Sequence, residues 1–279
     1  MTCSLPGFTR NGRWDESYYF IILLIMANPL NELNPTGRFS NRVENYARYR
    51  PSYPAELVPF LEGTLGLKKG QQVADIGSGT GILTEILLLK GYHVTGVEPN
   101  EAMRQEAERR LGGYDRFYSQ NGRAEETGLT DQSVHLITVA QAFHWMEQKA
   151  TRKEFMRILK PGGHIALIWN LRLPHTAFLQ AYEEFVQEFG HQYDAANRAV
   201  ESELAAFFMP MEMGIHTFSN VRLLDFEALK GLVLSSSYMP VEGAERYEEM
   251  INRLEELYAT HKENGLVKME YETKLYYNI

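Results

Sequence analysis

The chain has 279 residues, of which 44% are hydrophobic and 12% aromatic, so it is long and apolar enough to bury a sizeable core. This composition excludes a disordered protein and a disulfide-stapled miniature scaffold. The net charge of −8, from 28 Lys and Arg against 36 Asp and Glu, disfavours nucleic acid as a partner, because a polyphosphate backbone must be neutralised by basic side chains.

The N-terminal segment contains the single cysteine and a long apolar run. Cys3 has no partner for an internal disulfide, which fits a reducing, cytoplasmic location, and no metal site can be built from thiolates. Tyr18–Ala27 is about half of the roughly 20 apolar residues that a membrane-spanning helix needs, and no small-residue cleavage site follows it. We therefore expect neither a membrane partner nor secretion. Residues 1–37 form a leader, disordered in part; the apolar run is either an extra segment ahead of an internal start at Met26 or a strand or short helix packed on the domain.

Residues 72–98 predict a strand, a glycine turn, a helix and a second strand. The apolar run Gln72–Ile76 ends at glycines, after which apolar residues recur at helical spacing up to Leu89. Gly91 stands where this helix would end, and His93–Glu98 has the pattern of the next strand. Strands joined by such a helix lie parallel, with a right-handed connection.

The rest of the chain continues this alternation. Asn100 is a good N-cap for a second helix. Further strands are predicted at 116–119, 134–140 and 164–169, with a helix over 152–159 and a turn at 161–163. Later, amphipathic helices are predicted at 177–188 and 245–258, and alternating strands at 215–224 and 267–277. Strands that alternate with helices predict an open, doubly wound α/β sheet.

The glycine turn has the pattern D-x-G-x-G-x-G from Asp75 to Gly81. Glycines at alternate positions let the backbone approach a ligand where any Cβ would collide. The dinucleotide fingerprint needs another glycine at Ile82, and no Gly-Lys-Ser/Thr follows, so neither a dinucleotide motif nor a Walker loop is present. The carboxylate of Asp75 would repel a pyrophosphate and suits a cationic or amino-bearing ligand. Glu98, at the end of the second strand, can accept hydrogen bonds from ribose hydroxyls.

Five motifs then occur in register: VADIGSGTG, VTGVEPN, GRAEETGL, AQAFHW and LKPGG. In order and spacing they resemble the class I S-adenosylmethionine-dependent methyltransferases over at least residues 70–170. The segment RFSNRVENYARYRPSYP at 38–54 is similar to the lead-in of a small-molecule branch that includes trans-aconitate methyltransferase-like proteins. The resemblance implies a Rossmann-like α/β fold with a doubly wound, seven-stranded, mostly parallel sheet, completed by the strands at 215–224 and 267–277.

The domain organisation follows from the same comparison and from composition. We find no linker rich in Gly, Ser or Pro and no internal repeat, so residues 38–279 are predicted to form one methyltransferase domain. Its cofactor-binding core spans 70–170. Helical insertions at 171–213 and 225–265 are expected to cover the active-site face, although the Met and Phe residues of FFMPMEM at 207–213 are more typical of core packing.

The resemblance implies S-adenosylmethionine as the cofactor and gives the matching positions their roles. The glycine turn would pass under its methionine and ribose part, Asp75 would hold the methionyl ammonium directly or through water, and Glu98 would bind the ribose. Arg123 departs from the family pattern, because many relatives carry there an Asp that accepts a hydrogen bond from the adenine amino group. The expected cofactor-binding residues are Asp75, Gly77, Ser78, Gly79, Gly81, Glu98, Pro99, Ala124, Glu125 and Gln141.

Aromatic and basic residues supply the candidates for catalysis and substrate binding. His144 is the catalytic candidate, because an ordinary His pKa suits proton removal near neutral pH; the alternative is a structural histidine in an aromatic core segment. Aromatic rings attract a cationic sulfonium, which favours Tyr46 and Trp145, with Tyr49 and Tyr53 as further candidates. Arg50, and beyond it Arg172, could pair with a substrate carboxylate or be merely solvated. The expected substrate-binding residues are Tyr46, Arg50 and Trp145.

Together these features predict a methyltransferase that acts on a small-molecule acceptor, including a carboxylate, by in-line displacement. Holding the reacting atoms in line can supply on the order of 7–11 kcal/mol. Amine and hydroxyl acceptors are equally compatible with the sequence. Two other classes remain open at this point: a nicotinamide-dependent oxidoreductase, which would share the sheet but lacks its fingerprint here, and a catalytically silent cofactor-binding protein.

Overall fold

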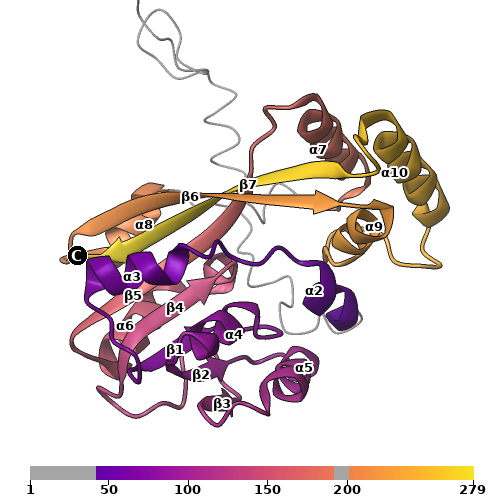
Figure 1. Ribbon diagram of the computed structural model, residues 1–279. Helices are drawn as coiled ribbons and strands as arrows, with labels where there is room; N and C mark the ends of the chain where they lie inside the picture. The colour runs from indigo at the N-terminus through magenta and orange to yellow at the C-terminus, as the bar shows by residue number, and fades with distance from the viewer. Residues whose placement is uncertain (1–41, 192–200) are drawn as a thin grey trace, which may run out of the picture.

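Helices and strands alternate along the chain in the computed structural model, which describes residues 42–191 and 201–279 (Figure 1). The predictions for the leader at 1–37, the run Tyr18–Ala27 and a start at Met26 lie outside the described residues. The elements are α2 (Val43–Tyr49), α3 (Leu57–Leu65), β1 (Gln72–Ile76), α4 (Ile82–Leu89), β2 (His93–Val97), α5 (Glu101–Leu111), β3 (Phe117–Gln120), β4 (Val134–Ala140), a 3₁₀ turn (Phe143–Trp145), α6 (Gln148–Ile158), β5 (Leu159–Arg172), α7 (Ala177–Phe189), α8 (Glu201–Phe208), β6 (Met213–Leu224), α9 (Phe226–Leu234), α10 (Tyr247–His261) and β7 (Val267–Asn278).

The strands of the described chain form one seven-stranded sheet in the order β3-β2-β1-β4-β5-β7-β6. Strands β1 to β5 pair in parallel, and β7 pairs antiparallel with both β5 and β6. The prediction of a doubly wound, seven-stranded, mostly parallel sheet is therefore confirmed. The strand order reverses between β1 and β4, and sheets of this type bind ligands at that point, beyond the carboxyl ends of the strands.

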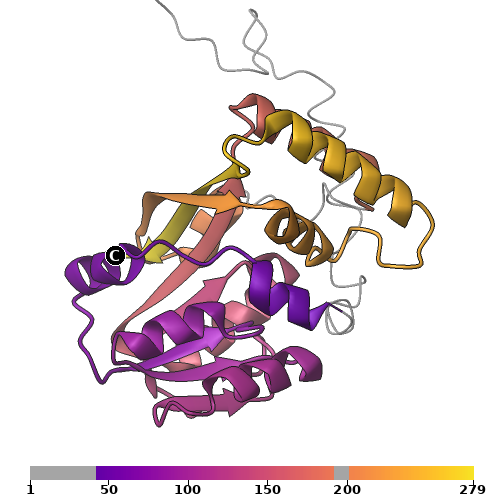
Figure 2. The ribbon, with the colours of Figure 1, turned by 45° about the vertical axis from the view of Figure 1, so that its right-hand side comes forward.

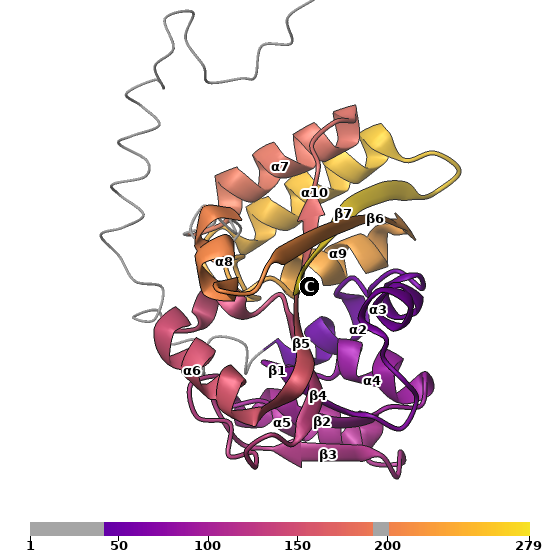
Figure 3. The same ribbon diagram turned by 90° about the vertical axis from the view of Figure 1, so that its left-hand side faces the viewer.

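Two layers of helices cover the faces of this sheet (Figure 3). On one face, Leu57 of α3, Leu87 of α4 and Leu111 of α5 are buried against apolar strand residues. On the other face, Phe155 of α6 and Phe208 of α8 are buried in a second cluster. Because both faces are covered, the central parallel strands consist of nearly continuous apolar runs, which is why the sequence revealed them.

A third group of helices, α7, α9 and α10, lies beyond the carboxyl end of β5 (Figures 1 and 2). Their apolar faces pack on one another and on the first half of β7. They occupy part of the two insertions predicted at 171–213 and 225–265. Helix α8, also within 171–213, belongs instead to the sheet layer, because Phe207 and Phe208 are buried in the core.

Two local boundaries differ from the sequence prediction. Helix α6 begins at Gln148 rather than at residue 152, because the side chain of Glu147 accepts hydrogen bonds from the amides of Lys149 and Ala150 and so caps the helix earlier. The turn predicted at 161–163 is an irregularity inside β5, where the pairing with β4 shifts register. No helix within the described ranges is long and apolar enough to cross a bilayer.

Candidate functional site

The glycine turn leaves β1 at the carboxyl edge of the sheet with a left-handed backbone at three positions. Gly77, Gly79 and Gly81 have φ values of 67°, 57° and 83°, a region that side chains other than glycine rarely adopt. A Cβ on Gly81 would lie only 2.5 Å from Cδ1 of Leu111, so this glycine lets α5 pack closely. A Cβ on Gly79 would meet only the ring of Tyr46, at 3.9 Å, so this part of the turn borders open space.

Asp75 is the penultimate residue of β1, just before this turn. Its side chain is 2% exposed and accepts hydrogen bonds from Oγ1 of Thr84 at 2.7 Å and Oγ1 of Thr138 at 2.8 Å. Burial raises the pKa of Asp75 to about 6, and the two hydroxyl donors oppose that rise. The carboxylate borders a small pocket with Tyr46, Tyr53 and the glycine turn, which we call the turn pocket. A desolvated carboxylate in such a pocket favours a cationic partner.

Glu98 follows β2 and connects two strand ends. Its Oε2 accepts from the amide of Gly79 at 2.9 Å and its Oε1 from the amide of Asn100 at 2.8 Å. Burial raises the pKa of Glu98, while these two backbone donors act in the opposite direction. Each carboxylate oxygen has a second lone pair, so the group can still accept hydrogen bonds from a ligand.

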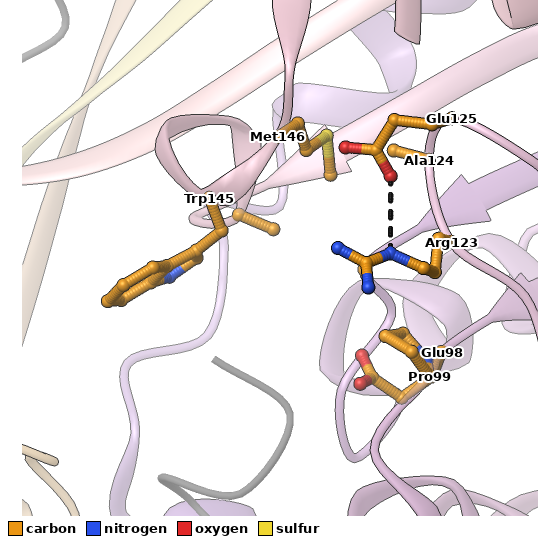
Figure 4. A pocket seen from close by; sticks show the side chains of 9 residues that line it. Glu98, Pro99, Arg123, Ala124, Glu125, Trp145 and Met146 are labelled. Atoms are coloured by element: carbon orange, nitrogen blue, oxygen red, sulfur yellow. Dashed lines mark ion pairs between the residues drawn. The ribbon is translucent and has the colours of Figure 1, made fainter. Parts of the chain in front are cut away.

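Glu98 also borders a second cavity, the outer pocket (Figure 4). This pocket brings together five of the predicted cofactor-binding positions from the ends of three strands. Arg123 lies on its wall, with Nε 3.5 Å from Oε2 of Glu125. Sequence reasoning missed Ala142, which stands inside the motif AQAFHW, and Met146, which directly follows it, because their apolar side chains carry no chemistry typical of a site. The full lining is Gly77, Glu98, Pro99, Arg123, Ala124, Glu125, Ala142, Trp145 and Met146.

A third cavity, the arginine pocket, contains both predicted arginines. The three pockets adjoin, because Trp145 borders the outer and arginine pockets, and Tyr46 and Tyr53 border the turn and arginine pockets. Tyr49 lies outside all three; its ring packs on Gly231 of α9. The predicted residues that line the arginine pocket are Tyr46, Arg50, Tyr53, Gln141, His144, Trp145 and Arg172, and those that the sequence did not reveal include Asn170, Tyr182, Ser236, Tyr238 and Tyr271.

The arginine pocket is positively charged. Nε of Arg50 is buried without a hydrogen-bond partner in the described chain, and its guanidinium lies 5.0 Å from the ring centre of Tyr46. Arg172 pairs with Tyr271 across β5 and β7, and its Nη2 lies 3.6 Å from a carboxylate oxygen of Glu183. The Tyr271 hydroxyl is also buried without a partner among the described residues. Two polar atoms without a partner in the described chain, Nε of Arg50 and the Tyr271 hydroxyl, thus belong to residues that line this pocket beside the Arg172 guanidinium.

Two further residues complete this wall. Burial lowers the pKa of His144 to about 4, and its Nδ1 has no hydrogen-bond partner within the described ranges. The imidazole is therefore neutral near pH 7 and a weak base. Burial raises the pKa of Tyr238, but the nearby Arg172 and Arg50 guanidinium groups outweigh that effect and leave it below the ordinary tyrosine value.

Comparison with known proteins agrees with this geometry. A family model described as a methyltransferase domain matches residues 74–167. An uncharacterized methyltransferase of Mycobacterium tuberculosis H37Rv is 32% identical over 232 residues, which cover 82% of this chain and 90% of the relative. An uncharacterized methyltransferase of Schizosaccharomyces pombe is 25% identical over 224 residues, which cover 80% of this chain and 87% of that protein.

Solved structures give the same fold. A type II methyltransferase candidate from Anaeromyxobacter dehalogenans has a TM-score of 0.61 at 20% identity, covering 82% of this chain and 97% of its own. A methyltransferase candidate from an antibiotic biosynthesis pathway of Anabaena variabilis has a TM-score of 0.58 at 19% identity, with 84% and 99% covered. The chain belongs to the class I S-adenosylmethionine-dependent methyltransferases, and the prediction of a methyltransferase enzyme is confirmed. The narrower resemblance to the trans-aconitate branch stays a prediction.

Proposed function

We propose that the protein binds S-adenosylmethionine across the outer and turn pockets and methylates a small carboxylate-bearing molecule held in the arginine pocket. In this arrangement Glu98 binds the ribose hydroxyls, Pro99 and residues 124–125 border the adenine, and Asp75 holds the methionyl ammonium directly or through water. The contiguity of the three pockets supports this order of groups along the edge of the sheet. The composition, with one cysteine, also supports the proposal that it works in the cytoplasm.

The residues present suit this cofactor. The open face of Gly79 leaves room for a ligand against the backbone. Asp75 and Glu98 supply two carboxylates at neighbouring strand ends, which match an ammonium group and a pair of hydroxyls. Neither carboxylate forms an ion pair closer than 4.0 Å within the described part of the chain, so their negative charge is available to a cationic ligand.

The proposed class of acceptor rests on a single observation, the environment of the Arg50 guanidinium. Its Nε is buried, it forms no ion pair within 42–191 and 201–279, and a second guanidinium, that of Arg172, lines the same pocket. A partly buried cation without a counter-ion is costly, and a planar guanidinium recognises a carboxylate with two parallel hydrogen bonds. We therefore assign a carboxylate to the acceptor.

The chemistry asked of the protein is modest. When bound, S-adenosylmethionine would supply a methyl group on a cationic sulfur. A nucleophile of the acceptor would attack the methyl carbon in line and displace the sulfur. The residues of the chain orient that nucleophile and exclude water; Tyr46 and Trp145 supply aromatic faces that attract positive charge by about 0.5–2 kcal/mol each. A carboxylate needs no base near pH 7, which agrees with a neutral His144. We propose that His144 contacts the acceptor through Nδ1.

Cofactor binding is tested with S-adenosylhomocysteine and isothermal titration calorimetry. Asp75→Ala and Gly79→Val are expected to abolish binding, the first by removing the ammonium partner and the second by filling the open face of the turn. Gly113→Val is the matched control, because a Cβ on Gly113 meets nothing within 4 Å and the residue lies outside the three pockets. Unchanged affinity in the first two variants would contradict the proposed cofactor site.

The acceptor class is tested with methyl-labelled cofactor and a panel of small acids, each paired with its amide or alcohol counterpart. We expect label to enter acids only. With any acid that is methylated, Arg50→Gln should raise KM by about 10-fold or more, in line with the loss of a charge-assisted hydrogen bond. Transfer to the neutral counterparts, or an unaffected KM in the variant, would overturn the assignment of Arg50.

A further inference from the structure

We propose that Arg123 recognises the cofactor base purely as a hydrogen-bond donor, so that this enzyme does not depend on the exocyclic amino group of adenine. This inference rests on the proposed function, in which the outer pocket holds the base. It concerns the one polar side chain of that pocket whose charge is opposite to that of Glu98 and Glu125.

The backbone of Arg123 is fixed at the pocket wall. Its amide donates to the carbonyl of Glu126 at 3.1 Å, and the amide of Glu126 donates back to the carbonyl of Arg123 at 3.1 Å. This closed pair of bonds holds the loop after β3. The side chain extends from it along the wall between Glu125 and the Glu98–Pro99 segment (Figure 4), and 62% of it is exposed at the pocket mouth. A purine in the pocket would therefore meet the guanidinium.

On this wall, the guanidinium of Arg123 is the group that still has N–H bonds to offer a ligand. Its Nε faces Glu125, but Nη1 and Nη2 donate to no group in the described chain. Both oxygens of Glu125 already have partners, since Oε1 accepts from the amide of Glu147 at 2.8 Å and Oε2 lies 3.5 Å from Nε of Arg123. Both oxygens of Glu98 accept from backbone amides. The group with unused N–H bonds at the base is Arg123.

Base chemistry then decides what Arg123 can recognise. A guanidinium donates and never accepts, so it can bond the ring nitrogens of adenine but cannot accept from the amino group. The purine edge that arginine bonds best is the O6 and N7 pair of a 6-oxopurine. Replacing the amino group of adenine with a carbonyl oxygen, as in hypoxanthine, therefore offers Arg123 an extra acceptor beside N7, while N1 changes from an acceptor to a donor. A carboxylate at this position would do the opposite and reject the oxygen by about 10- to 100-fold.

The experiment compares S-adenosylhomocysteine with S-inosylhomocysteine, in which a carbonyl oxygen replaces the amino group at C6 and N1 carries a hydrogen instead of a lone pair. Dissociation constants are measured by calorimetry for the unmodified protein, Arg123→Asp, Arg123→Gln and the control Arg116→Asp. Arg116 is exposed just before β3 and lines none of the three pockets, so its substitution makes the same change of net charge away from the site. Thermal unfolding verifies that each variant is folded.

We expect the unmodified protein and Arg116→Asp to bind the two ligands within about 3-fold of each other. Arg123→Asp should favour S-adenosylhomocysteine by about 10-fold or more, and Arg123→Gln, which can both donate and accept, should fall between. A preference for the adenosyl ligand that is the same in the unmodified protein and in Arg123→Asp would overturn the inference. Failure of the unmodified protein to bind S-adenosylhomocysteine would contradict the proposed function instead.

Discussion

Asp75 carries a charge in a place that disfavours it. The carboxyl is buried, and its pKa in the folded protein is about 6, against roughly 3.9 in an unfolded chain. The folded state therefore holds its proton more tightly, so the free energy of unfolding falls as pH rises from about 4 to 6 and stays lower above that. A group that weakens the fold at working pH while bordering a pocket is typical of a binding residue.

Asp75→Asn is accordingly expected to stabilise the protein at pH 7.5 by on the order of 2–3 kcal/mol, because it removes the buried charge and keeps the shape. The gain should shrink toward pH 4, where the native carboxyl is protonated. Urea unfolding of both proteins at the two pH values measures this difference. The same variant should lose S-adenosylhomocysteine binding; a gain in stability that does not change with pH would show that the charge is not its cause.

His144 shows what burial does to an inference made from residue type. An exposed histidine titrates near pH 6.5, which is why the sequence favoured it as a base. Burial lowers its pKa to about 4 in the folded protein. Solvent exposure depends on tertiary packing, so the sequence does not predict this shift.

His144→Ala is expected to lower kcat and leave the affinity for S-adenosylhomocysteine nearly unchanged. In the unmodified enzyme, kcat should be flat between about pH 5.5 and 8, because the imidazole stays neutral throughout that range. Steady-state rates across pH, with an acid from the acceptor panel, measure both effects. An inflection near pH 6.5 that disappears in the variant would instead identify His144 as a titrating base.

At the scale of elements, α2 is held over the site by its ends. It has no fully buried residue. Arg42, immediately before it, donates to the carbonyls of Leu234 at 3.1 Å, Ser236 at 2.5 Å and Met239 at 2.5 Å, and so caps the end of α9. At the other end, Arg222 donates to the carbonyl of Tyr49 at 2.6 Å. The helix and the turn after α9 therefore form one cover over the turn and arginine pockets.

Arg42→Gln is expected to loosen that cover without unfolding the domain. A glutamine amide cannot reach three carbonyls, so amide hydrogen exchange should accelerate in 43–49 and 235–239 while β1 and β4 stay protected. Exchange measured by mass spectrometry resolves these segments. Arg48→Gln is the control, because Arg48 is exposed on the same helix. Equal acceleration throughout the chain would mean that Arg42 supports the whole fold rather than the cover.

The sequence predicts helices and strands accurately where a local apolar pattern determines them. β1 and β4 were predicted with their observed bounds, because each is an apolar run buried on both faces. α2 and α3 were not predicted, and α9 was predicted only as part of the helical insertion at 225–265. α2 in particular has no apolar stripe of its own and is fixed by side chains distant in sequence, which no local pattern reveals.

At the scale of the molecule, the outer and turn pockets could be predicted from the sequence more completely than the arginine pocket. The outer and turn pockets come mainly from residues 75–146, whose short motifs sit at fixed distances from the strand ends. The arginine pocket gathers Arg50, Arg172, Tyr238 and Tyr271 from four separate segments. Arg172 and Tyr271 meet only because β7 pairs antiparallel with β5, a register that sequence spacing does not give.

The outer and turn pockets are formed at the carboxyl ends of the central strands. A ligand bound there should therefore stabilise the whole domain. S-adenosylhomocysteine at about 100 times its dissociation constant should add about 2.7 kcal/mol to the free energy of unfolding. For a domain of this size that is a rise in Tm of about 5–10 °C. NAD at the same concentration should give no shift, because the turn lacks the dinucleotide glycine and carries Asp75, which repels a pyrophosphate. Thermal unfolding with each ligand, repeated on Asp75→Ala, separates the two; a larger shift with NAD, or an equal shift in the variant, would place the bound ligand outside this edge of the sheet.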